Sequence, residues 1–413
     1  MTWLLRTAYI CCVAAIASCG NQQQQMQNFN AYGGTHRTNN FEVNGTFTAS
    51  FTFTEKARLT KDDKTTKLPG AIALPVPASF STSYIATADG FVVRVTDKIV
   101  QWRSKLDSNA LVAAALCGDQ SDNVYAVATD GAVYAFAADG KRRWKTPIFP
   151  TDVVYSNPLL VNDGLVVACS NGQIAKLSTN GKTLWQYRST LAPTKTLAED
   201  EQDNIIVLLS HDTPGATDTV LALANTNGAV RWKRAVPNVR LLYSPACANG
   251  LIFAVGLLDS STVRIPVLCA FKPDGTPVWR KDLLVTPTGI AVNGSMVVVA
   301  GTKLGIASPV AAVLAFSPQG KELWRKGFEN MQVVSVPMIS KEIIGVVGIQ
   351  EKASGIYYLK HDGTFSSVFS ISDMPPMLLQ PVVDYDGNMV FAMTEELGTV
   401  RIGRSPAQKL LPY

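Results

Sequence analysis

The 413-residue sequence has few of the side chains that most metal sites and nucleophilic enzymes require. It contains three histidines, His36, His211 and His361, and none lies in a Gly-x-Ser-x-Gly or comparable motif. Its seven cysteines form no Cys-x-x-Cys pair and no Cys/His group with metal-ligand spacing. These absences argue against a zinc site, a dithiol redox motif and nucleophilic catalysis.

Charged side chains are also scarce, at 17% of the residues against 47% hydrophobic residues. The net charge of +5 is small for this length, and the basic residues form no single stripe interleaved with aromatic residues. Such a stripe is the usual footprint of a nucleic-acid-binding protein, so we expect no nucleic acid partner. The high apolar content predicts a large buried core and excludes a mainly disordered chain.

The beginning of the chain differs in character from the remainder. One basic residue, Arg6, precedes an apolar run over residues 7–17 that is too short to span a bilayer. This layout is typical of a secretory signal peptide, which is removed from the mature protein. We therefore predict a signal peptide over residues 1–18.

The predicted signal ends in a motif that resembles the lipobox of bacterial lipoproteins, Ile16-Ala17-Ser18-Cys19. The resemblance implies cleavage before Cys19 and acylation of that residue, and several acyl chains hold a protein durably on a membrane. The alternative is an ordinary secretory signal with a chance cysteine. Because Gly20 and not aspartate follows, the resemblance implies the periplasmic face of an outer membrane. Residues 19–40 are predicted to be the lipidated cysteine and a polar tether.

Six tryptophans recur in one local setting. Five of them stand four residues after the glycine of an Asp-Gly, Asn-Gly or Gln-Gly pair, and the first follows a degenerate version. The positions are Trp102, Trp144, Trp185, Trp232, Trp279 and Trp324, with Ser367 in the seventh. Successive positions are 41 to 47 residues apart, which is a period typical of β-propeller blades.

Short apolar runs between these positions predict strands. Residues 165–169, 173–177 and 184–187 are each too short for a helix and are bounded by Asn-Gly or Asp-Gly pairs, which favour tight hairpins. Three consecutive hairpins make a four-stranded antiparallel meander, whose strands we letter A to D from the ring axis outward. The innermost strand A is expected to be mainly apolar and small, as in residues 111–115.

The repeat unit from Val133 to Trp144 resembles those of pyrroloquinoline-quinone-like propellers. Residues 29–38, which contain a Gly-Gly pair, are similar to the segment that precedes the first strand in that family. The resemblance covers residues 29–405 and implies that the six tryptophans dock between neighbouring blades. It indicates architecture and leaves activity open, because enzymes, assembly factors and sensors share the repeat.

The predicted fold is all-β, an eight-bladed β-propeller of four-stranded antiparallel meanders over residues 41–413, with seven blades as the alternative. The last unit, residues 377–402, supplies three strands and no tryptophan strand. Within residues 41–55, residues 46–54 alternate between apolar and polar side chains, as a strand does. We expect this N-terminal strand to pair with the C-terminal unit, which would close the ring and remove two exposed edges.

Quinone-dependent dehydrogenases are the enzymes that the resemblance suggests. They hold pyrroloquinoline quinone over calcium and use adjacent cysteines and a tryptophan floor. Here the only adjacent cysteines, Cys11 and Cys12, lie in the predicted signal, and the repeat accounts for all six later tryptophans. We therefore expect no enzyme activity, no catalytic, cofactor-binding or metal site, and neither the quinone nor calcium.

Two acidic stretches have a structural and a functional interpretation. Residues 384–388 faintly suggest a calcium loop but align with ordinary hairpin turns and lack its spaced acidic set. Residues 199–201 with Asp203 form an acidic cluster that we interpret as a charged A to B hairpin tip. The alternative for this cluster is a contact with a cation or a basic partner.

The B to C turns of units four to seven are predicted to be expanded, at residues 211–219, 257–266, 301–310 and 350–355. These turns emerge on one face of the ring, and insertions confined to one face often mark a binding surface. The candidate partner surface consists of Leu257, Leu258, Leu304 and Ile306. Neutral drift in surface loops is the alternative.

The lipid anchor and the repeats together resemble the BamB-type lipoproteins of the barrel assembly machinery. The resemblance implies a non-catalytic, membrane-anchored scaffold for protein–protein interaction in the cell envelope, with barrel-assembly components as partners and outer-membrane protein assembly as the role. A quinone-dependent dehydrogenase is the alternative. A module that binds glycans or small ligands in the central channel is the second alternative, which the apolar A strands disfavour.

Overall fold

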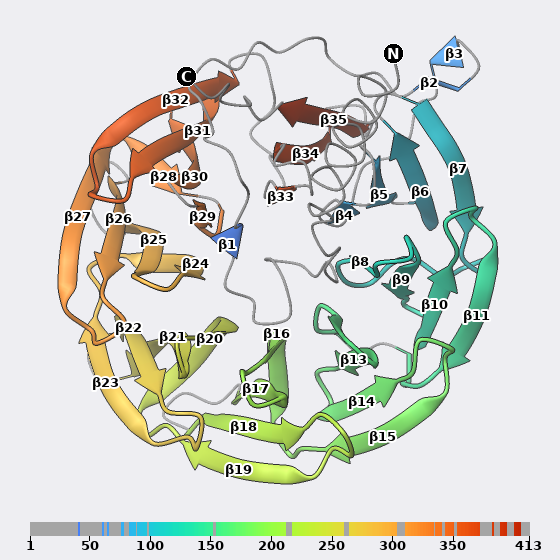
Figure 1. The fold of residues 1–413 in the computed structure, drawn as a ribbon, viewed down its shortest axis with the longest axis horizontal. Helices are drawn as coiled ribbons and strands as arrows, with labels where there is room; N and C mark the ends of the chain where they lie inside the picture. Colours follow the sequence, from blue (N-terminus) through green and yellow to red (C-terminus); the bar gives the residue numbers. More distant parts are fainter. Residues whose placement is uncertain are drawn as a thin grey trace, which may run out of the picture.

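The computed structural model describes residues 40–41, 60–61, 64–65, 76–77, 82–87, 89–96, 99–151, 154–211, 217–259, 264–303, 310–333, 335–340, 343–350, 353–371, 382–383, 389–394 and 400–405. Their strands form eight sheets that follow one another round a ring (Figure 1). The predicted signal peptide and Cys19 lie outside the described residues. Within them, no helix combines the length and hydropathy of a membrane span.

Five consecutive sheets are four-stranded antiparallel meanders, numbered here from the second to the sixth. Their strands are β8 (Cys117–Gly118), β9 (Val124–Val127), β10 (Ala132–Phe136) and β11 (Arg142–Pro147); β12 (Leu159–Val161), β13 (Gly164–Ala168), β14 (Gln173–Leu177) and β15 (Thr183–Arg188); β16 (Ala192–Glu199), β17 (Asn204–Ser210), β18 (Thr219–Ala224) and β19 (Val230–Ala235); β20 (Val239–Ala248), β21 (Leu251–Asp259), β22 (Arg264–Phe271) and β23 (Pro277–Asp282); and β24 (Thr286–Val292), β25 (Val297–Lys303), β26 (Val310–Phe316) and β27 (Glu322–Glu329).

The remaining sheets carry additions or lack a strand. The first contains β4 (Val76–Pro77), β5 (Thr82–Ala86), β6 (Phe91–Thr96) and β7 (Ile99–Lys105), with β2 (Thr60–Lys61) and β3 (Lys64–Thr65) outside β7. The seventh contains β28 (Met331–Val333), β29 (Met338–Ser340), β30 (Ile343–Gln350), β31 (Ala353–Lys360) and β32 (Phe365–Ile371), with β1 (Asn40–Phe41) parallel to β29. The eighth contains β33 (Val382–Val383), β34 (Met389–Thr394) and β35 (Val400–Ser405).

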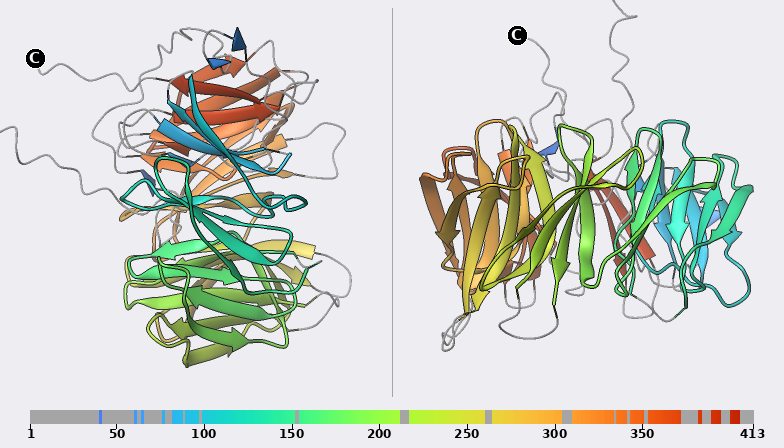
Figure 2. Two further views of the ribbon diagram at one scale, coloured as in Figure 1. Left: turned by 90° about the vertical axis from the view of Figure 1, so that its right-hand side faces the viewer. Right: turned by 90° about the horizontal axis from the view of Figure 1, so that it is seen from below.

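The ring is a thick disc with two faces (Figure 2). The A to B and C to D turns lie on one face, and the B to C turns and the D to A crossovers lie on the other, because each sheet is a meander. The tight turns use residues with positive φ, including Asp122 and Asp203 between strands A and B, and Gly131 and Gly172 between strands B and C. Asp, Asn and Gly are favoured there because they tolerate the left-handed region.

The core lies between neighbouring sheets, since both faces of the inner strands are covered. Ile206 of β17 packs with Ile252 of β21 in one apolar cluster. The next residue of β21, Phe253, faces the opposite side and packs with Val297 of β25 in another cluster. Successive side chains of a strand point to opposite faces, so each apolar run serves two interfaces at once.

The strand expected to close the ring falls on residues 41–55, of which only Phe41 is described. Phe41 belongs to β1, whose pairing is with the inner strand of the seventh sheet and not with the C-terminal unit. The inner strands β33 and β4 of the eighth and first sheets lie next to one another.

Candidate interaction surface

The tryptophan of each outer strand lies against the last hairpin of the following sheet. Its ring covers the glycine of that hairpin so closely that an added Cβ at Gly228 would stand 2.7 Å from the Trp185 ring. The indole Nε1–H donates to a carbonyl in the same turn. These bonds run from Trp102 to Ala138 (2.8 Å), Trp144 to Thr179 (2.9 Å), Trp185 to Asn225 (2.8 Å), Trp232 to Pro273 (2.6 Å), Trp279 to Pro318 (2.9 Å) and Trp324 to His361 (2.6 Å).

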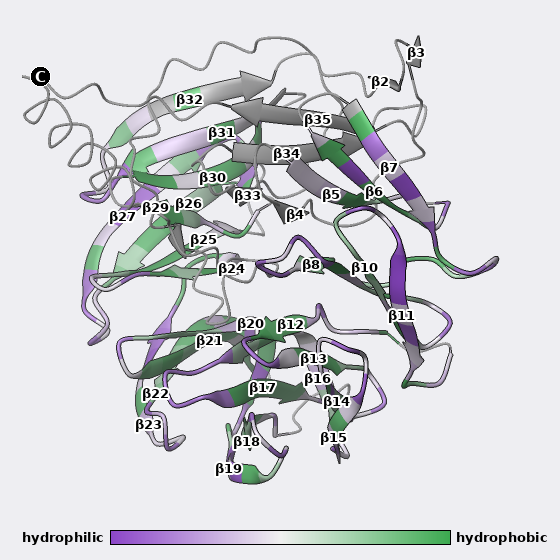
Figure 3. Cartoon of the chain, turned by 45° about the vertical axis from the view of Figure 1, so that its right-hand side comes forward, coloured by the Kyte–Doolittle hydropathy of each residue, from purple (hydrophilic) through white to green (hydrophobic). Residues whose placement is uncertain are grey.

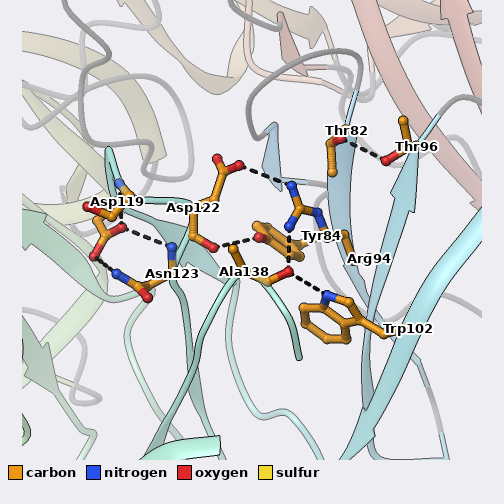
Figure 4. A network of polar contacts seen from close by, with 10 residues as sticks. Thr82, Tyr84, Arg94, Thr96, Trp102, Asp119, Asp122, Asn123 and Ala138 are labelled. Carbon is orange, nitrogen blue, oxygen red and sulfur yellow. Dashed lines mark hydrogen bonds and ion pairs between the residues drawn. The ribbon is translucent and has the colours of Figure 1, made fainter. Parts of the chain in front are cut away.

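A cationic side chain joins the tryptophan at three of these interfaces. At one of them Arg234 donates to the Gly275 carbonyl, in the turn that Trp232 contacts. Arg94 donates to the Ala138 carbonyl that also accepts the Trp102 indole, and it forms an ion pair of 3.1 Å with Asp122 (Figure 4). The hydroxyl of Tyr84 donates to the Asp122 carbonyl at 2.6 Å. These groups come from two neighbouring sheets, so the network ties one sheet to the next.

Lys176 occupies the corresponding place between the third and fourth sheets. Its side chain is fully buried, and Nζ donates to Asp163 at 2.6 Å and to the Asn225 side chain at 2.6 Å. The Asn225 carbonyl accepts from both Lys176 and Trp185. A buried ammonium needs such partners because desolvation without compensation is costly. The tryptophan sites are therefore structural joints, in which the indole donors are already occupied.

The face with the B to C turns and the D to A crossovers is rigidly held. In the second sheet, the amide of Phe149 in the crossover donates to the carbonyl of Gly131 in the turn at 3.0 Å. In the third sheet, Ser189 donates to Gly172 at 2.8 Å. A Cβ at Gly131 would lie 2.0 Å from the Phe149 carbonyl oxygen, so glycine is required for this close approach.

Two crossovers present an exposed apolar side chain in the same way. The amide of Leu111 donates to the Thr129 hydroxyl at 3.0 Å, and that of Val154 donates to the Ser170 hydroxyl at 3.1 Å. Each carbonyl accepts the amide of the same threonine or serine. Since both backbone groups are satisfied, the backbone is fixed while the side chains stay 41% and 68% exposed. These two side chains, in neighbouring crossovers, form what we call the crossover patch.

The predicted exposed loop at Leu257 and Leu258 was wrong. Both residues lie in β21, where Leu257 pairs with Arg240 and Pro266, and Leu258 pairs with Val239 and Ile265. Leu258 and Ile265 are partly buried against the core between the fourth and fifth sheets. The additional residues lengthen the hairpin instead of the loop, because strand β20 provides a pairing partner along its whole length.

The expansion predicted at residues 350–355 was also wrong. β30 continues to Gln350 and β31 begins at Ala353, which pair with each other across a two-residue turn. Leu304 and Ile306 lie outside the described residues, so their place on the candidate partner surface stays a prediction. In the first of the predicted expanded turns, at residues 211–219, Asp218 closes the base of the turn.

The buried carboxylate of Asp218 joins this turn to the fifth sheet. It accepts the amide of His211 at 2.8 Å and the amide of Leu241 at 2.6 Å, and its side chain is 1% exposed. His211 Nδ1 lies 3.3 Å from the same carboxylate. We interpret this His/Asp pair as structural. The buried carboxylate accepts two backbone amides and so holds two segments of the chain together.

The acidic cluster forms a hairpin tip. Asp200 is buried and accepts the amides of Gln202 and Asn204, both at 2.9 Å, which stabilises its own turn. Glu201 accepts the amide of Gly250 from the next sheet at 3.0 Å. No group of three or more His, Cys, Asp or Glu side chains with metal-binding geometry occurs among the residues that the structure describes.

The four cysteines within the described residues, Cys117, Cys169, Cys247 and Cys269, are buried and form no disulfide with one another. Burial raises the pKa of the Cys269 thiol to about 12. Burial, with the nearby Asp200 carboxylate, raises the pKa of Cys247 well above its usual value. A nucleophilic cysteine needs a lowered pKa, so these thiols act as small apolar groups.

The inner strands contain a feature that the sequence analysis missed. Hydroxyl groups here bond between neighbouring sheets. Ser156 Oγ, just before β12, donates at 2.7 Å to the carbonyl of Thr194 in a bulge of β16, and Thr288 Oγ1, in a bulge of β24, donates to the Ser335 carbonyl at 2.6 Å. Tyr243 has a φ of 61° in another bulge, where positive φ is rare for an aromatic residue. The sequence signal for these bonds was a serine or threonine close to a proline of the inner strands.

A sequence profile described as outer membrane protein assembly factor BamB matches residues 88–257 and 266–399, which is well over half of the chain. The chain belongs to the BamB family. The resemblance to BamB-type repeats is thereby confirmed. No curated protein matches the sequence significantly.

Solved structures support the same architecture for this BamB-family chain. BamB from Moraxella catarrhalis superimposes with a TM-score of 0.59 at 18% identity, over 80% of this chain and 95% of that one. The quinohemoprotein alcohol dehydrogenase from Comamonas testosteroni gives 0.60 at 12% identity, over 84% and 76%. A europium-containing methanol dehydrogenase gives 0.60 at 12%, over 87% and 88%. At these identities the likeness establishes the β-propeller fold alone.

Proposed function

We propose that this BamB-family chain is a non-catalytic scaffold that binds protein partners in the bacterial cell envelope, in the assembly of outer-membrane proteins. The observation that carries the proposal is the crossover patch, in which Leu111 and Val154 are held exposed by identical backbone contacts on one face. Apolar side chains on a rigid frame bind a partner without loss of backbone entropy. The family match supports barrel-assembly components as the partners.

The double variant Leu111→Glu/Val154→Glu tests this proposal. In the complex the two introduced carboxylates would be buried at the interface and would lose their hydration. We expect binding to weaken by tenfold or more, which corresponds to a loss of at least about 1.4 kcal/mol. Recovery of barrel-assembly components from detergent-solubilised membranes, with the tagged chain as bait, is the measurement. We expect normal recovery with the wild type and loss with the double variant.

Leu184→Glu is the matched control. Leu184 is 44% exposed against 41% for Leu111, but it lies on the outer strand β15, away from the crossovers. Melting temperatures should be equal for all three proteins, because exposed substitutions usually change stability by about 0.5 kcal/mol or less. If the double variant recovers the same components as the wild type, or the wild type recovers none, the proposal fails.

We also propose that Cys19 is lipidated and that the chain is held on the periplasmic face of the outer membrane. Cys19→Ser should abolish incorporation of labelled palmitate and move the protein to the soluble fraction, because the thioether requires the sulfur. Fractionation and labelling of the full chain measure both effects. Palmitate incorporation that persists in Cys19→Ser would contradict the anchor.

The eight-bladed ring with an N-terminal closing strand belongs to the same proposal. Phe41 lies at the inner edge of the seventh sheet, and Thr60 lies at the outer edge of the first sheet. The residues between these two points lie outside the described part of the chain, and the outermost described strand of the eighth sheet is β35. We propose that the N-terminal segment pairs with β35.

Quinone chemistry is not part of the proposal, because the residues do not fit the cofactor. The ring of each repeat tryptophan packs on the hairpin glycine of the next sheet, and its N–H bonds to a carbonyl there, so these rings are already used as joints and offer no floor for a quinone. The cysteines within the described ranges are separate and buried. A glycan in the channel is the least supported alternative. Ser156 and Thr288 already donate their hydroxyl protons to the neighbouring sheet, so they cannot donate them to a sugar.

A further inference from the structure

The D strands of the first six sheets share a basic character. Each of β7, β11, β15, β19, β23 and β27 contains between one and three lysines or arginines. β11 is hydrophilic over most of its length (Figure 3). Apart from β7, which pairs with β2, none of these strands has a described partner at its outer edge, and cationic side chains prevent another strand from adding there.

β32, the outermost strand of the seventh sheet, departs from this pattern. Its sequence, FSSVFSI, contains no charged residue and no proline. Phe365 and Val368 are 45% and 46% exposed. Among the described residues no strand pairs with its outer edge. An uncharged, apolar edge of this kind is a site at which a further strand can add.

Apolar side chains extend from β32 towards the sixth sheet. The ring of Phe328 in β27 lies 5.6 Å from that of Tyr357 in β31 and 6.5 Å from that of Phe365, both in edge-on contact. Val368 is opposite Tyr357 in the pairing of β31 with β32. The edge and its flank therefore form one apolar band across two sheets, which we call the β32 band.

The sequence of β32 is largely complementary to itself. In an antiparallel pair centred on Val368, Val368 stands opposite Val368 of the second copy, Ser366 opposite Ser370, Phe365 opposite Ile371, and Ser367 opposite Phe369. Except for the Ser367 and Phe369 pairs, apolar residues then face apolar residues and serines face serines, which are favourable cross-strand pairs. The same pairing of β19 centred on Lys233 would place two ammonium groups opposite each other.

We propose that the β32 band is a self-association surface, at which β32 pairs antiparallel with β32 of a second copy of this chain. The contact is isologous, as the interfaces of most symmetric dimers are, and it joins two seventh sheets into one continuous sheet. It lies on the outer rim and leaves the crossover patch of both copies free for other partners.

Disulfide trapping of Val368→Cys in the full chain tests the proposal. Residues directly opposite in an antiparallel pair have Cβ atoms about 4.5 to 5.5 Å apart, close enough for a disulfide after a small adjustment. Under copper–phenanthroline oxidation, we expect Val368→Cys to convert to a covalent dimer on non-reducing gels. The wild type reports any cross-linking through native cysteines.

Val278→Cys is the matched control, because Val278 is 45% exposed against 46% for Val368 and lies on the outermost strand β23, whose neighbouring cations oppose self-pairing. It should remain monomeric. In a second measurement, sedimentation in detergent, Val368→Lys should shift the wild-type dimer to monomer while Val278→Lys leaves it unchanged. A monomeric wild type, or equal cross-linking of the two cysteine variants, overturns the proposal.

Discussion

Trp185→Ala should lower the free energy of unfolding by about 3 to 5 kcal/mol, as truncation of a buried tryptophan usually does. Trp185 is 7% exposed, its ring covers Gly228, and its N–H bonds to the Asn225 carbonyl in the next sheet. Truncation would leave a cavity at this joint and remove one of the donors to that carbonyl. Chemical denaturation followed by tryptophan fluorescence or circular dichroism measures the change.

Leu184→Ala is the control for this effect, since Leu184 precedes the tryptophan in β15 and is 44% exposed. It should change stability by about 0.5 kcal/mol or less. Equal stabilities for Trp185→Ala and Leu184→Ala would mean that the tryptophan joint contributes little. In a ring whose units contact mainly their neighbours, a weakened joint destabilises the units on both sides.

Gly131→Ala is expected to destabilise the protein by about 2 to 4 kcal/mol, which combines the left-handed conformation with steric overlap. Gly131 has a φ of 79°, and an added Cβ would lie 2.0 Å from the Phe149 carbonyl oxygen. Relief would require movement of the crossover that Gly131 holds through its own carbonyl. Thermal denaturation of the variant and the wild type gives the difference.

Gly250→Ala separates the two contributions. Gly250 also has positive φ, 65°, but an added Cβ at this position would meet no atom within 4 Å among the described residues. Its substitution should therefore cost only the conformational part, roughly 1 kcal/mol. If Gly131→Ala is no worse than Gly250→Ala, the close approach of turn and crossover does not constrain the fold.

Much of the architecture was predictable because the repeat depends on local chemistry. The glycine four residues before five of the six tryptophans marks a hairpin that must turn with positive φ, as Gly228 and Gly275 do. The spacing of these pairs predicted units of one meander each, and five sheets follow that pattern with four strands. The family assignment rests on the same residues.

The candidate surface was less predictable, because a sequence does not state where a hairpin ends. Additional residues between two strands can lengthen the loop or extend both strands. At Leu257 and Leu258 the strands are extended, because β20 runs alongside and offers backbone partners up to Val239. The exposed apolar residues include Leu111 and Val154, in crossovers whose sequences carry no obvious signal.

By itself, the sequence determined the turns, the period and the register of the tryptophans, since these follow from side-chain size and from the backbone freedom of glycine within a few residues. Only the tertiary structure decided which apolar side chains stay exposed. Exposure depends on what the neighbouring sheet covers: Leu258 is packed against the fourth sheet, while Phe365 and Val368 remain on a strand with no described outer neighbour. Packing between segments far apart in the sequence therefore decides where apolar side chains stay exposed. The proposed binding surfaces lie at two such places, the crossovers and β32.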